Sequence, residues 1–117
     1  LMDALMSPTS PKRYRKETSY VYSCGWPPVF LGDLNYYLED YDLRAVAGEI
    51  DTKRLGVHIL SAEYDCSGTA ELGRAAHKAI PGSTFQEMKN VGHFPMSENP
   101  KAFLQYLLPT LDNVATD

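Results

Sequence analysis

Residues 57–88 constrain the fold more than any other part of this sequence. Val57 to Ala62 is a short, mostly apolar run, which is typical of a strand buried on both faces of a parallel sheet. Thr69 then caps a helix with apolar residues at helical spacing, Pro81-Gly82 ends it, and Ser83 to Met88 has the length of a second strand. This order predicts a right-handed βαβ unit, so the two strands should be parallel and adjacent.

Two parallel strands make an incomplete sheet. Parallel sheets usually have several strands and carry helices on both faces. We therefore expect this segment either to complete a larger sheet or to expose a long unpaired edge. The chain begins with Leu1 instead of methionine, which favours the interpretation that it is a fragment of a longer protein.

Helices are predicted on both sides of this unit. Residues 1–6 resemble the end of a helix, and Ser10-Pro11 supplies the cap and first residue of another that ends near Gly25. Asp33 is the expected N-cap of a helix that runs to Tyr41. After the second strand, Asn99-Pro100 should begin a final helix that runs to Leu108 and is kinked or ended by Pro109.

The composition excludes several classes of function. The 117 residues, 44% of them hydrophobic and 22% charged, are ordinary for one globular domain. A net charge of -4 offers no basic surface for nucleic acid or an anionic membrane. No apolar run is long enough to span a membrane and no secretory signal is present, so we expect a cytoplasmic protein.

The cysteines and histidines give no metal pattern. Cys24 and Cys66 form no Cys-x-x-Cys pair and are too few for a disulfide scaffold, so we expect two free, buried thiols. His58 lies within the first predicted strand and His77 on the outer side of the predicted helix, which favours structural roles for both. We expect neither a metal nor a cofactor.

The candidate site consists of Asp65 and His93. Asp65 follows the first strand, and His93 follows the second on a loop with Gly92, which allows a tight turn, and Pro95. Functional groups in parallel sheets gather beyond the carboxyl ends of the strands, so these two side chains should meet at one edge. The carboxylate would bind one ring nitrogen of the histidine and leave the other free to act as a general base.

Two other acids remain open as partners of the histidine. Glu63 is the closer rival to Asp65 because it lies in the same loop, and Asp42 is the second alternative.

The residues around this pair resemble the C-terminal end of an α/β-hydrolase. The resemblance covers about residues 50–112 and rests on Ala62-Glu63-Tyr64-Asp65, Ile80-Pro81-Gly82-Ser83 and Gly92-His93-Phe94-Pro95-Met96-Ser97-Glu98-Asn99-Pro100. It implies that Asp65 is the triad acid and His93 the base, with Ala62 in place of the usual glycine. Residues 1–48 resemble the end of a helical cap, and residues 49–117 the C-terminal βαβα part of the core.

The nucleophile of such an enzyme is missing from this sequence. The family presents it on a Gly-x-Ser-x-Gly elbow between a strand and a helix, and no such motif is present. Ser23-Cys24-Gly25 is the nearest imitation, but it ends a predicted helix instead of opening one. The resemblance implies a hydrolase of a small organic substrate, most simply an ester, that needs no cofactor and of which this chain holds only the acid and base.

A non-catalytic role is the alternative interpretation. An incomplete sheet exposes an edge and an apolar face, and such surfaces usually bind a partner. The chain would then be an interaction module that forms a homo-oligomer or binds the missing N-terminal half of the fold.

Overall fold

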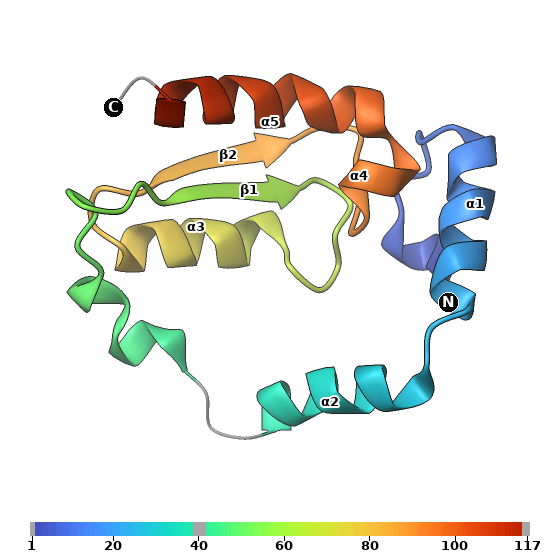
Figure 1. Cartoon of the computed structure of the whole chain (residues 1–117), viewed down its shortest axis with the longest axis horizontal. Coiled ribbons are helices and arrows are strands. Elements are labelled where there is room, and N and C mark those ends of the chain that lie inside the picture. The colour runs from blue at the N-terminus through green and yellow to red at the C-terminus, as the bar shows by residue number, and fades with distance from the viewer. Residues whose placement is uncertain (1, 39–41, 116–117) are drawn as a thin grey trace.

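The computed structural model describes residues 2–38 and 42–115, and its centre is a parallel sheet of two strands (Figure 1). Strand β1 (His58–Ala62) pairs with β2 (Thr84–Met88), with His58 opposite Thr84 and Ala62 opposite Met88. Each strand begins one residue later than predicted and ends at the predicted residue. The parallel, adjacent pairing is confirmed, and the chain has a mixed α/β fold.

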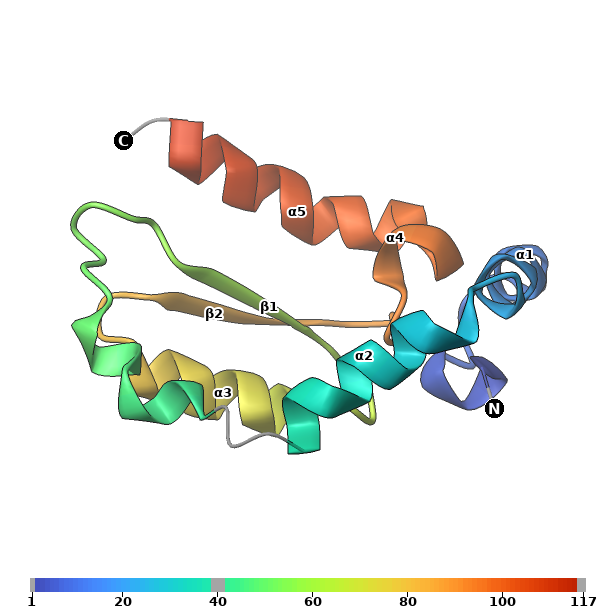
Figure 2. The same ribbon diagram turned by 60° about the horizontal axis from the view of Figure 1, so that its bottom comes forward.

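Helices cover both faces of this sheet. Helix α3 (Ala70–Ala79) lies on one face and α5 (Pro100–Ala115) on the other (Figures 1 and 2). Thr69 caps α3 as predicted, because its side chain accepts a hydrogen bond from an N–H of the first turn. Asn99 does the same for α5. The short helix α4 (Pro95–Glu98) lies in the loop between β2 and α5.

The hydrophobic core lies between the sheet and α5, near the carboxyl ends of the strands. Ala62, Met88 and Val91 form its centre and are at most 5% exposed. Partly buried side chains from β1 and α5 pack against them, namely Leu60, Ala102, Phe103 and Tyr106. The loops that follow both strands therefore start beside this hydrophobic core.

Pro109 was predicted to kink or end the helix, but it lies inside α5, so the helix does not end there. Proline removes one helical hydrogen bond, in this case the one to the carbonyl of Gln105. Both Pro109 and Gln105 are exposed, so water can bind the carbonyl that loses its partner. The helix continues for six more residues, to Ala115.

The helices before the sheet differ from the prediction at their N-terminal ends. Residues Met2–Leu5 form a 3-10 turn, while Leu1 lies outside the described residues. Helix α1 (Lys12–Ser23) begins after Pro11, and the side chain of Ser10 turns away from it to bind Glu98. Ser10 is therefore not a helix cap, because a buried carboxylate takes its hydroxyl.

Helix α2 (Pro27–Leu38) begins six residues before the predicted cap, Asp33, which lies inside it. The fixed backbone angle of proline suits the first turn of a helix, so Pro27-Pro28 can start this helix. The predicted end at Tyr41 lies outside the described residues. Two further 3-10 turns, Leu43–Ala45 and Ala47–Glu49, lead toward β1.

Helix α2 lies apart from the sheet and from α3 and α5 (Figure 1). It and the residue before it expose several large apolar side chains: Trp26, Val29, Leu31, Leu34 and Leu38. None of the helices in the described part of the chain has the length and hydrophobicity that crossing a membrane requires.

Both cysteines are free and exposed, so the prediction of buried thiols was wrong. Cys24 follows the last turn of α1, and Cys66 lies in the loop after β1. Neither residue lies on the inward face of a helix or strand, which is where packing would have buried it.

Helix α3 approaches the sheet closely at Gly73. A Cβ atom at this position would lie 2.0 Å from Ser61 Oγ and 2.9 Å from Phe85 Cε2. The absence of a side chain at Gly73 therefore sets the distance between α3 and the sheet.

We expect Gly73→Ala to destabilise the protein by about 1 to 3 kcal/mol, because overpacking outweighs the gain of about 0.5 to 1 kcal/mol in helix propensity. Urea unfolding followed by circular dichroism measures the change. Gly32→Ala is the matched control, because Gly32 is also helical and a Cβ there meets nothing within 4 Å. Equal stabilities of the two variants would contradict the close packing of α3.

Candidate functional site

Asp65 and His93 lie together beyond the carboxyl ends of the two strands. Asp65 Oδ2 is 3.0 Å from His93 Nδ1. The Asp65 side chain is 13% exposed and that of His93 is 40% exposed, so the acid is sheltered and the imidazole reaches solvent. The predicted meeting of these two side chains is confirmed.

The loop after β1 fixes the carboxylate of Asp65. Its Oδ1 accepts hydrogen bonds from Ser67 N at 2.8 Å, Ser67 Oγ at 2.8 Å and Gly68 N at 3.0 Å. Partial burial raises the pKa of Asp65, but the bonds from Gly68, Ser67 and His93 together outweigh it and hold that pKa below its ordinary value. Asp65 is therefore an ionised acceptor with Oδ2 directed at the imidazole.

His93 uses Nδ1 for its contacts within the chain. Besides Asp65, Nδ1 lies 3.0 Å from Ser67 Oγ. Within residues 2–38 and 42–115, Nε2 makes no hydrogen bond with another residue of the chain. A carboxylate can only accept hydrogen bonds, so a neutral imidazole in this setting carries its proton on Nδ1 and presents an unprotonated Nε2.

The backbone around His93 is held by a buried carboxylate. Glu98 is 0% exposed, and its Oε1 accepts hydrogen bonds from Gly92 N at 3.0 Å and Phe94 N at 3.1 Å. These two N–H groups flank His93. The other carboxylate oxygen of Glu98, Oε2, accepts hydrogen bonds from Ser7 N at 2.7 Å and Ser10 Oγ at 2.8 Å. We name Glu98 and these four donors the Glu98 cluster.

The Glu98 cluster replaces a counter-ion with hydrogen bonds. No Lys or Arg in the described part of the chain forms an ion pair with Glu98, although burying a charge costs several kcal/mol unless it is well bonded. Four donors fill the four acceptor positions of a carboxylate and leave none for a proton. The cluster ties the N-terminal segment, residues 5–10, to the His93 loop.

Gly92 allows this close approach. A Cβ atom there would lie 2.5 Å from Leu5 O and 2.7 Å from Ser7 N. The N–H of His93 donates to Leu5 O at 2.8 Å. Gly92 was expected to allow a tight turn, but its φ is not positive, so the backbone does not need glycine for that reason. Glycine is needed here because the N-terminal segment passes where a side chain would lie.

The aromatic ring of Phe94 lies against the imidazole. The Phe94 ring is 5% exposed, and its centroid lies 4.7 Å from that of His93 in an edge-to-face arrangement. The Phe94 ring also packs against Tyr22 of α1, with a centroid distance of 4.0 Å. Met96, three residues after His93 on α4, has an exposed side chain. His93 therefore has an apolar neighbour that also contacts the helical segment.

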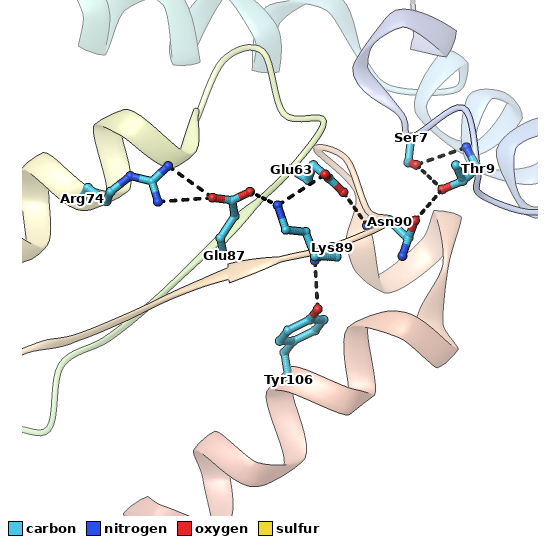
Figure 3. Close-up of polar contacts among 8 residues, drawn as sticks. All are labelled: Ser7, Thr9, Glu63, Arg74, Glu87, Lys89, Asn90 and Tyr106. Carbon is cyan, nitrogen blue, oxygen red and sulfur yellow. Dashed lines mark hydrogen bonds and ion pairs between the residues drawn. The ribbon is translucent and has the colours of Figure 1, made fainter.

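Glu63, the rival acid, is engaged elsewhere. It pairs with Lys89 at 3.3 Å and accepts a hydrogen bond from Asn90 N at 3.0 Å (Figure 3). Lys89 also pairs with Glu87, which in turn binds Arg74. These contacts secure the end of β2, where Asn90 takes a positive φ of 63°. Glu63 makes no contact with His93, so it is not the partner acid.

Asp42, the second alternative, binds Arg44 in a 3-10 turn that precedes β1. The local pairing occupies its carboxylate, and Asp42 makes no contact with His93. The other two histidines also bind hydroxyls, since His58 Nδ1 contacts Thr84 Oγ1 and His77 Nδ1 contacts Ser83 Oγ, each at 2.8 Å.

The segment that imitates a nucleophile elbow ends a helix. Ser23 is the last residue of α1, and its Oγ donates to the carbonyl of Tyr20 at 2.7 Å. Between residues 2 and 22 no strand precedes it, so the hydroxyl is not presented as an elbow would present it. Among the described residues, no group of three or more His, Cys, Asp or Glu side chains is placed to hold a metal ion.

Sequence reasoning missed three residues of the site: Ser67, Glu98 and Ser10. Ser67 had a usable signal, because Asp-x-Ser is a spacing at which an aspartate binds the backbone two residues on. Glu98 and Ser10 had no such signal, because they are 88 residues apart in the sequence.

Comparison of this chain with family models, with curated proteins and with solved structures gives no match.

We expect Glu98→Gln to lower the free energy of unfolding by about 2 to 3 kcal/mol, because a carboxamide offers one acceptor oxygen and turns an NH₂ group toward donors. Urea unfolding measures the change. Glu49→Gln is the control, since Glu49 is an exposed carboxylate in the 3-10 turn Ala47–Glu49. A Glu98→Gln variant as stable as the control would show that the cluster does not hold the N-terminal segment.

Proposed function

We propose that this chain carries the acid and base of a hydrolase of the α/β-hydrolase type. The observation that supports the proposal most is the 3.0 Å contact between Asp65 Oδ2 and His93 Nδ1 beyond the carboxyl ends of two parallel strands. The substrate class is a small organic molecule, most simply an ester.

The chemistry follows from the two nitrogens of His93. Nε2 takes the proton of a nucleophilic hydroxyl or thiol as that atom attacks the substrate carbonyl, and the imidazolium then gives the proton to the leaving alkoxide. Asp65 stays ionised, holds the Nδ1 proton and stabilises the cation. A water molecule then attacks the acyl intermediate and gives a proton to Nε2, the bond between the acyl group and the nucleophile breaks, and the imidazolium returns the proton to the nucleophile as the acid product leaves.

The nucleophile in this proposal comes from a segment outside the chain. Residues 1–48 act as the end of a helical cap over the imidazole, and residues 49–117 as the C-terminal part of the core. The contact between Tyr22 of α1 and Phe94, the residue after His93, supports this arrangement, because it brings the helical segment next to the base.

We expect His93→Ala to lower kcat/KM for p-nitrophenyl esters about 10²- to 10⁴-fold in the complete gene product that contains this chain, because a general base contributes that much. His77→Ala is the matched control, since His77 is exposed on α3 and binds Ser83. The chain alone should show no turnover that depends on His93. Equal rates for the complete parent protein and its His93→Ala variant would refute the hydrolase proposal.

A second candidate function is self-association without catalysis. Both strands of the sheet are edge strands, and α2 lies apart with exposed apolar side chains. Edges and apolar patches of this kind favour pairing with another chain. A second copy of the chain would then cover α2 or extend the sheet.

If this second function holds, sedimentation velocity of the 117-residue chain should show a dimer or larger species that gains population with concentration. Leu31→Lys together with Leu38→Lys should shift it to monomer, because both side chains are well exposed on α2. Leu72→Lys on α3 is the control for a charge added to another exposed leucine. A compact monomer at every concentration would count against self-association.

A further inference from the structure

Ser67 contacts both members of the Asp65–His93 pair. Its Oγ lies 2.8 Å from Asp65 Oδ1 and 3.0 Å from His93 Nδ1. In the described part of the chain, no other hydroxyl makes a hydrogen bond to either side chain. Ser67 is exposed, so packing does not dictate the position of its side chain.

The donor and acceptor roles of the Ser67 hydroxyl follow from the number of protons that the three side chains can share. A serine hydroxyl has one proton and two lone pairs, whereas an ionised carboxylate has only lone pairs. The Ser67 proton therefore lies toward Asp65 Oδ1, and the hydroxyl turns a lone pair toward His93 Nδ1. Nδ1 then faces two acceptors, the Ser67 hydroxyl and Asp65 Oδ2, and both contacts are satisfied only when Nδ1 carries a proton.

We propose that Ser67 is a positioning residue of this pair, which keeps the Asp65 carboxylate turned toward His93 and favours the tautomer with a free Nε2. Its value to catalysis rests on the proposed hydrolase function. Ser67 is not the nucleophile in this arrangement. The Ser67 hydroxyl donates its hydrogen bond to Asp65 Oδ1, and the adjacent nitrogen, His93 Nδ1, already carries a proton and cannot accept another.

The hydroxyl can be separated from the turn that surrounds it. Asp65 Oδ1 also accepts from the backbone N–H groups of Ser67 and Gly68, and these two bonds survive in an alanine variant. Ser67→Ala therefore removes only the two contacts made by Oγ. Ser67→Thr returns a hydroxyl at an exposed position that has room for the added methyl group.

The tautomer of His93 is measured directly by ¹⁵N NMR of the chain labelled at histidine. The spectra are recorded at a pH where the imidazole is neutral, and each signal is assigned by histidine-to-glutamine variants. The parent chain should show Nδ1–H as the main form. In Ser67→Ala the ratio of Nδ1–H to Nε2–H should fall about fivefold, as expected for the loss of one hydrogen bond, and Ser67→Thr should restore it.

Ser97→Ala is the matched control, because the Ser97 hydroxyl binds the carbonyl of Phe94 in the same loop and does not contact the imidazole. Its tautomer ratio should equal that of the parent. An unchanged ratio in Ser67→Ala, a loss that threonine does not restore, or an equal loss in Ser97→Ala would each overturn the role of Ser67. Because this measurement needs no turnover, it can succeed or fail independently of the ester hydrolysis that tests the hydrolase proposal.

Discussion

The burial of the Glu98 carboxylate is the constraint on which the rest of the candidate site depends. A charge without a counter-ion is tolerated in the interior only if donors surround it, and here all four acceptor positions are filled. Two donors flank His93 and two belong to the N-terminal segment. Satisfying one carboxylate thus fixes the backbone around the base and attaches the N-terminal segment to the His93 loop.

The two members of the Asp65–His93 pair are anchored in different ways. Asp65 is held by its own turn, with partners two and three residues further along the chain. His93 is held by the Glu98 cluster and by the carbonyl of Leu5. The acid is therefore positioned by local structure and the base by contacts between distant parts of the sequence, and Ser67 lies where the two arrangements meet.

This difference explains which features the sequence could predict. The βαβ unit, the cap of α3 and the meeting of Asp65 with His93 follow from local patterns, because strand ends and turn residues leave a signal in a few neighbouring positions. The four donors of Glu98 leave no such signal. Ser10 has the pattern of a helix cap, and only the folded chain shows that a carboxylate 88 residues away takes its hydroxyl. The start of α2 at Pro27 and the continuation of α5 beyond Pro109 were not predicted, because proline both starts helices and is tolerated at an exposed helical position.

The bond between Ser7 and Glu98 joins residues 91 positions apart. Closing so large a loop costs entropy before any contact compensates for it, so such contacts form late in folding. Until the N-terminal segment reaches Glu98, this carboxylate lacks two of its donors, whereas the turn that holds Asp65 needs only residues two and three positions further along the chain. We therefore expect the turn that holds the acid to form before the loop that holds the base, which depends on contacts between distant parts of the sequence.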